Sequence, residues 1–122
     1  MPEFGKYTKE LKKLIDEADH ILLICHINPD GDAIGAMLAM RSWINSRGKD
    51  AGMISPNALQ KFLLWMNDVD RVVDFHHNPD TGSELINNAD LIIMVDFNAT
   101  SRMGKAEQLV ISSKARKVMI DH

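Results

Sequence analysis

Two short runs of residues are apolar at every position: Ile-Leu-Leu-Ile-Cys at 21–25 and Leu-Ile-Ile-Met-Val at 91–95. An unbroken apolar run of this length is typical of a β-strand buried on both faces, and it is too short to span a bilayer. Segments with the helical spacing of apolar residues separate such runs. Strands that alternate with helices favour a parallel sheet. The sequence therefore predicts an α/β fold, with a five-stranded parallel sheet and helices on both faces.

The predicted elements follow from the spacing of apolar residues and from the turn residues between them. The helices are predicted at 6–18, 33–46, 57–67, 83–88 and 106–115. The strands are predicted at 21–25, 51–54, 72–75, 91–95 and 118–120.

Composition narrows the class of protein. A chain of 122 residues is of single-domain size, and its formal charge of −3 is mild. Lysine and arginine are scattered, so no basic block marks a nucleic-acid duplex as the partner. The single cysteine, Cys25, cannot form an internal disulfide and is predicted to be a core residue. The N-terminal stretch has no apolar signal region. We therefore expect a cytoplasmic protein that does not bind membranes.

Ionisable side chains follow three of the predicted strands, at the point where each strand ends. In parallel sheets covered by helices, ligands bind beyond the carboxyl ends of the strands. The residues at these ends are His26, Asp30 and Asp32 after 21–25, Asp96 after 91–95, and Asp121 and His122 after 118–120. Each has a simpler explanation alone, such as a helix N-cap at Asp32 or a turn at Asp96. Together they favour one site.

The residue types at these strand ends suit two divalent cations. Carboxylates and imidazoles together are ligands typical of Mn²⁺ and similar ions. The predicted ligands are His26 and Asp30 for one ion, Asp32 and His122 for the other, and Asp96 as the bridge. Gly31 is expected to let the loop turn tightly between two aspartates. Two ions about 3.5–4 Å apart activate a water and clamp the attacking and leaving oxygens of a phosphoryl displacement.

The pattern His-x-Asn-Pro-Asp occurs a second time, at 76–80, but without a second aspartate or a glycine-rich helix start. We interpret this copy as a turn, followed by a short helix that Thr81 and Glu84 begin with a capping box. His76 and His77 are then expected to be solvated loop residues.

The stretches HINPDGDAIGAMLAM (26–40), LIIMVDFNATSRMG (91–104) and MIDH (119–122) resemble the N-terminal part of a DHH-family phosphoesterase. Within that family, Pro-Asp-Gly-Asp-Ala-x-Gly resembles the nano-RNase branch of oligoribonucleases and phosphoadenosine-phosphate phosphatases. The resemblance supports the same five metal ligands, and it implies that Asp32, Asp96 and His122 take part in catalysis. The resemblance also implies that Asp121 supports the metal ligands without binding the metals. It implies that Asn28, Gly31 and Arg102 lie beside the metals or the substrate.

The chain departs from the family pattern at its end. The signature Asp-His-His stops after its first histidine, His122, and a further metal-binding aspartate and a C-terminal substrate-binding domain do not follow. Residues 1–122 are therefore expected to be a partial, truncated DHH domain. We predict that this chain alone has little or no activity and that its full-length parent is active.

The expected function is Mn²⁺-dependent hydrolysis of short single-stranded RNA or of 3′,5′-bisphosphorylated nucleotides through a two-metal site. A homodimer of the full-length protein is considered as its assembly. The alternatives are a cyclic-dinucleotide phosphodiesterase of the same family and a non-catalytic nucleotide- or metal-binding module. A pyrophosphatase is less favoured, because that family prefers threonine where this chain has Gly31. A phospho-acceptor domain is disfavoured, because no lysine follows 118–120.

Overall fold

The computed structural model describes residues 2–95 and 102–120. Its strands are β1 (Ile21–Ile24), β2 (Ala51–Ser55), β3 (Val72–Asp74), β4 (Leu91–Val95) and β5 (Arg116–Ile120). Its α-helices are α1 (Pro2–Glu17), α2 (Gly31–Ser46), α3 (Pro79–Asn88) and α4 (Glu107–Ser112). The strands form one parallel sheet in the order β3-β2-β1-β4-β5. The predicted five-stranded parallel sheet is confirmed. No helix within the described residues combines the length and apolar character that crossing a bilayer requires.

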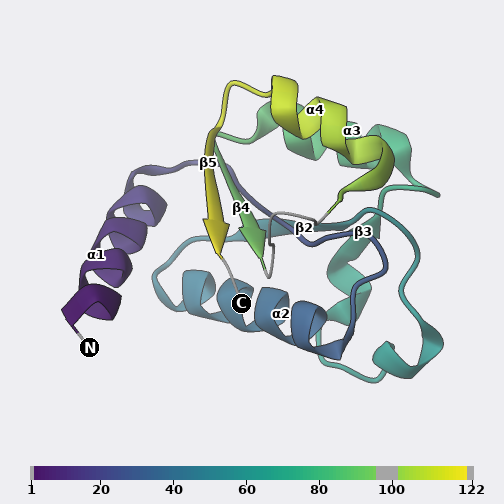
Figure 1. Ribbon diagram of the computed structural model, residues 1–122, viewed down its shortest axis with the longest axis horizontal. Coiled ribbons are helices and arrows are strands. Elements are labelled where there is room, and N and C mark those ends of the chain that lie inside the picture. The colour runs from purple at the N-terminus through teal and green to yellow at the C-terminus, as the bar shows by residue number, and fades with distance from the viewer. Residues whose placement is uncertain (1, 96–101, 121–122) are drawn as a thin grey trace.

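The sheet separates two apolar cores, because alternate residues of each strand point to opposite faces. On one face, Leu23 of β1 and Ile93 of β4 pack with Ile34 and Met37 of α2 and with α1. On the other face, Leu22 and Ile24 of β1 pack with residues of α3 and α4, including Ile86 and Val110. Figure 1 shows α2 on one side of the sheet and α3 and α4 side by side on the other. Helices on both faces, as predicted, explain why β1 and β4 are apolar throughout.

The strand order creates a switch point between β1 and β4. The chain leaves β1 through α2 on one face of the sheet, and it leaves β4 toward α4 on the other. The two connections diverge, and in doubly wound sheets this divergence opens a crevice at the carboxyl ends of the two strands. The predicted metal residues His26, Asp30 and Asp32 lie in the connection that follows β1.

The helix predicted at 57–67 is wrong. This segment contains only a short 3₁₀ turn, η1 (Lys61–Leu63), followed by further i→i−3 turns. Leu63 and Met66 point toward α2, while Phe62, Leu64 and Trp65 are exposed. Leu63 and Met66 hold the segment against α2, but the segment does not form a helix. It ends at Asp68, which has a left-handed conformation with φ of 66°. Helix-like spacing of apolar residues arose here from successive tight turns.

Three smaller corrections concern element ends. Helix α3 begins at Pro79, four residues before the predicted start, because proline suits the first turn of a helix. Thr81 therefore lies inside the helix, and the predicted capping box is wrong: the N-cap is Asn78, which makes no side-chain cap bond. Helix α4 covers only Glu107–Ser112 of the predicted 106–115 and follows the 3₁₀ turn η3 (Gly104–Ala106).

Candidate metal centre

The loop between β1 and α2 is fixed at its end by Asp30. This residue is the N-cap of α2, and its Oδ1 accepts a hydrogen bond from the backbone N–H of Ala33 at 2.8 Å. Asp32 lies in the first helical turn and is exposed, so the alternative explanation of Asp32 as the N-cap is wrong. Both carboxylates lie at the helix N-terminus, where the helix dipole favours negative charge. One Asp30 oxygen caps the helix, and a carboxylate has a second oxygen with which to bind a cation.

His26 begins the same loop and is half-buried. Its ring Nδ1 lies 2.8 Å from the carbonyl oxygen of Ile27. A carbonyl only accepts hydrogen bonds, so Nδ1 carries the proton and the lone pair of a neutral ring is on Nε2. A backbone carbonyl on the other ring nitrogen is the usual way of fixing a metal-binding histidine. This contact of His26 therefore suits the role of a metal ligand.

The tight turn of the loop is at Asn28 rather than at Gly31. Asn28 has φ of 55°, whereas Gly31 is the first residue of α2 and has no positive φ. A Cβ at Gly31 would be 3.7 Å from Cδ2 of Leu63, an ordinary contact. The predicted role of Gly31 in turning the loop is wrong. Asparagine is among the residues that adopt the left-handed conformation most readily.

The connection after β4 returns to this loop at Arg102. The carbonyl oxygen of Arg102 accepts a hydrogen bond from the N–H of Ile27 at 2.7 Å, and the residue is exposed. A Cβ at Gly104 would be 3.5 Å from Cδ1 of Ile27, so the two connections are in contact across the switch point. The backbone of Arg102 therefore lies beside the loop that contains His26 and Asp30. A contact of its guanidinium with phosphate stays a prediction.

Three predicted site residues, Asp96, Asp121 and His122, lie outside the described residues. The strands that precede them end in register, since Val95 of β4 pairs with Ile120 of β5 and Ile24 of β1 pairs with Met94. Asp96 follows Val95 and Asp121 follows Ile120 in the sequence.

A metal centre fits these residues only in part. Among residues 2–95 and 102–120, no three His, Cys, Asp or Glu side chains are grouped closely enough to hold a metal ion. The donor chemistry of His26, Asp30 and Asp32 nevertheless suits a hard or borderline divalent cation. The loop supplies donors that need partners from another strand end, which is the role predicted for Asp96 and His122.

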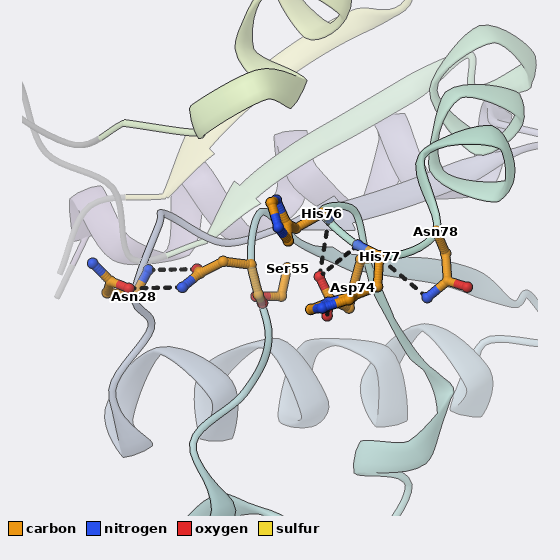
Figure 2. A network of polar contacts seen from close by, with 7 residues as sticks. Asn28, Ser55, Asp74, His76, His77 and Asn78 are labelled. Carbon is orange, nitrogen blue, oxygen red and sulfur yellow. Dashed lines mark hydrogen bonds and ion pairs between the residues drawn. The ribbon is translucent and has the colours of Figure 1, made fainter.

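The two histidines of the second His-x-Asn-Pro-Asp copy are bonded to Asp74, the last residue of β3. Oδ1 of Asp74 accepts hydrogen bonds from the backbone N–H groups of His76 and His77 at 3.0 and 3.4 Å. Oδ2 of Asp74 lies 2.6 Å from Nδ1 of His77. Both histidines are exposed, as predicted. Figure 2 shows Asn28 of the loop after β1, Ser55 at the end of β2 and Asp74 at the end of β3 in this order across the view.

Sequence reasoning missed Asn57, which follows β2. Its side chain makes two hydrogen bonds to Asn28 in the candidate metal loop. Ser55, at the end of β2, is fully buried, and its hydroxyl donates to the carbonyl oxygen of Asn57 at 2.6 Å. The rule that ligands gather at strand ends points to the residues after the strand predicted at 51–54, but it gives no sign that Asn57 pairs with Asn28.

The fold and the loop define a doubly wound α/β domain with candidate metal ligands at its switch point. The sequence profile of the DHH family, N-terminal domain, matches residues 20–122, and the chain therefore belongs to the DHH family. The predicted family is confirmed. The narrower nano-RNase branch stays a prediction.

Two relatives illustrate the match. The crystal structure of an exopolyphosphatase-related protein from Bacteroides fragilis superposes with a TM-score of 0.90 at 35% sequence identity, over 97% of this chain and 35% of that chain. The cyclic-di-AMP phosphodiesterase GdpP of Bacillus subtilis is 24% identical over 117 residues, which are 92% of this chain and 18% of GdpP. The chain thus spans about a third or less of the length of these relatives.

Proposed function

We propose that this chain is the metal-binding part of a phosphoesterase that uses two divalent ions, preferably Mn²⁺. The observation that carries the proposal is the position of His26, Asp30 and Asp32 in the loop and first helical turn that follow β1, at the switch point of a DHH-family sheet. When bound, the ions would activate a water and offset the charge that develops on the phosphoryl oxygens. His26 would supply a nitrogen donor in a fixed tautomer. Asp30 and Asp32 would supply carboxylates.

The ligand set needs Asp96 and His122 in addition. We propose that Asp96 bridges the two ions, that His122 binds the ion held by Asp32, and that Asp121 supports them from behind. These residues follow β4 and β5 in the sequence, so two ions would connect three neighbouring strand ends. We further propose that a polypeptide continuing past His122 supplies the remaining donors and the substrate-binding domain. The chain alone would then bind metal but turn over little or no substrate.

The proposed substrates are short single-stranded RNA and 3′,5′-bisphosphorylated nucleotides. Support comes from the sequence Asn-Pro-Asp-Gly-Asp-Ala-Ile-Gly at 28–35, which resembles the nano-RNase branch. A specific observation favours a second candidate, a cyclic-dinucleotide phosphodiesterase, because GdpP matches 92% of this chain. Both candidates share the metal loop and differ in the substrate that reaches it.

Calorimetric titration of the chain with Mn²⁺ tests the metal proposal. We expect two ions to bind, with weaker binding in Asp96→Asn and Asp32→Asn. Asp80→Asn is the matched control, because Asp80 is an exposed aspartate in the first turn of another helix, α3. Equal binding by wild type and both site variants would contradict the proposal.

Activity assays on a longer polypeptide separate the substrate candidates. Each assay would contain Mn²⁺, with a chelator as the negative control. Faster hydrolysis of a short RNA or of phosphoadenosine phosphate supports the leading proposal, and faster hydrolysis of cyclic di-AMP supports the alternative. Rapid turnover by the 122-residue chain itself would contradict the proposal that it is inactive alone.

A further inference from the structure

Two hydrogen bonds join the loop after β1 to the loop after β2. The backbone N–H of Asn28 donates to Oδ1 of Asn57 at 2.8 Å, and Nδ2 of Asn57 donates to Oδ1 of Asn28 at 2.7 Å. One carboxamide thus accepts from the main chain and donates to the side chain of the same residue. A carboxylate could only accept, and an ammonium could only donate. The amide of Asn57 makes both bonds, which neither of these charged groups could do.

The residue that Asn57 holds is the turn of the candidate metal loop. Asn28 lies two residues after His26 and two residues before Asp30, and its φ of 55° is in the left-handed region. A residue in this region keeps its conformation when its surroundings determine it. If Asn28 left this conformation, the chain direction between His26 and Asp30 would change, and the two donors would separate.

Asn57 can hold this turn because its own backbone is anchored. The hydroxyl of Ser55, which is fully buried, donates to the carbonyl oxygen of Asn57 at 2.6 Å. Pro56, between them, is also buried and has a restricted φ. Ile54 of β2 pairs with Ile24 of β1, so both loops leave neighbouring strands at the same level. Asn28 is exposed, so water competes for its hydrogen bonds. Because the backbone of Asn57 is anchored, its amide stays in position to bond Asn28.

The loop is held at three successive points. Ile27 is held by the carbonyl of Arg102, Asn28 is held by Asn57, and Asp30 is held by its cap bond to Ala33. The first contact comes from the connection after β4 and the second from the connection after β2. Groups that hold metal ligands in place typically affect metal affinity about 10- to 100-fold.

We infer that Asn57 is a positioning residue of the metal centre, which holds His26 and Asp30 in binding geometry through Asn28. The inference rests on the proposed function. Asn57 acts through the turn and is not itself a ligand. It extends the site to β2, a strand that contributes none of the five predicted ligands.

The test compares Mn²⁺ binding by wild type and Asn57→Ala, using calorimetry together with the electron paramagnetic resonance spectrum of the bound ion. We expect about 10- to 100-fold weaker binding in Asn57→Ala and a changed spectrum at saturating Mn²⁺. Asn28→Gly keeps the left-handed backbone and the bond from its N–H, so we expect a smaller loss. Asn87→Ala is the matched control, because Asn87 is an exposed asparagine of α3. It should bind Mn²⁺ like wild type.

A metal-free measurement distinguishes positioning from a general loss of structure. Exchange of the Asn28 amide hydrogen should accelerate in Asn57→Ala, while the amides of β1 and β4 exchange as in wild type. If wild type binds Mn²⁺ and Asn57→Ala binds it equally well, the inference alone is overturned. Accelerated exchange throughout β1 and β4 would also overturn it, because Asn57 would then support the whole fold. If wild type binds no Mn²⁺, the proposed function fails and the inference fails with it.

Discussion

Asp30 caps helix α2 through a 2.8 Å hydrogen bond from the backbone N–H of Ala33 to its Oδ1. The same residue is a proposed metal ligand, so one carboxylate would both cap a helix and bind a metal ion. The two tasks require different properties. Capping requires an oxygen acceptor at the start of the helix, whereas metal binding requires negative charge as well.

Two substitutions of Asp30 separate these tasks. Asp30→Ala removes both, so we expect the free energy of unfolding to fall by about 1 kcal/mol and Mn²⁺ binding to weaken. Asp30→Asn keeps a good N-cap, so its stability should stay within about 0.5 kcal/mol of wild type while Mn²⁺ binding weakens. Urea unfolding without metal and calorimetric titration measure the two effects. An Asp30→Asn variant that binds Mn²⁺ like wild type would remove Asp30 from the proposed ligands.

Much of the fold could be predicted because a continuous apolar run indicates a strand that is buried on both faces. The continuous apolar residues of β1 and β4 require cover on both faces, and this requirement fixes a parallel sheet between helices. The strand-end rule then pointed to the connection after β1, which contains His26, Asp30 and Asp32. Metal binding by these residues stays a prediction.

Other features could not be predicted because they depend on contacts between distant segments. Asn57 is 29 residues from Asn28, and nothing near it in the sequence indicates that its amide reaches another loop. The segment at 57–67 has helical spacing, but Leu63 and Met66 reach α2 from successive tight turns and not from a helix. Gly31 suggested a turn by its type, whereas the turn is at Asn28. The local sequence shows which residue types are present and how the apolar residues are spaced. Contacts between distant segments decide which residue adopts the left-handed conformation.

The contact of Leu63 with α2 predicts a difference between two neighbouring leucines. Leu63 is 2% exposed and lies near Gly31, whereas Leu64 is 57% exposed. We expect Leu63→Ala to lower the free energy of unfolding by about 2–5 kcal/mol, because it leaves a cavity beside the first turn of α2. Leu64→Ala should change it by no more than about 0.5 kcal/mol. Chemical denaturation of both variants measures the difference, and equal losses would contradict the described docking of this segment.

Two helix glycines are predicted to respond oppositely to alanine. A Cβ at Gly82 in α3 would be 2.5 Å from Cδ2 of Phe75, whereas a Cβ at Gly35 in α2 would meet only Cε of Met66 at 3.7 Å. Alanine stabilises a helix interior by about 1 kcal/mol relative to glycine where space allows. We therefore expect Gly35→Ala to gain about 0.5–1 kcal/mol of stability. Gly82→Ala should lose about 1–3 kcal/mol, because the ring of Phe75 is buried and must shift.

Thermal unfolding of the two glycine variants provides the measurement. Gly82→Ala should unfold at a lower temperature than wild type and Gly35→Ala at a higher one. A stabilised Gly82→Ala variant would show that Phe75 moves at little cost, and that the packing between α3 and the end of β3 is looser than described.

The ion pair between Asp16 of α1 and Arg47 after α2 predicts a pH dependence of stability. Nε and Nη2 of Arg47 lie 3.1 and 2.5 Å from the two carboxylate oxygens of Asp16. This hydrogen bonding lowers the pKa of the Asp16 carboxyl below its ordinary value of 3.8. Since the pKa is lowered in the folded chain, the stabilisation is present above pH 3.8 and is lost as the pH falls through the folded-state pKa.

Asp16→Asn should therefore unfold at a slightly lower temperature than wild type at pH 7, and the difference should shrink as the pH falls below 3.8. Because the pair is at the surface, the difference at pH 7 should also decrease as salt is added. Glu17→Gln, the same change of charge at the next position, is the control and should show a smaller difference at pH 7. A deficit of Asp16→Asn that is the same at low and neutral pH would mean that its cause is lost packing between α1 and α2, not the charge of this ion pair.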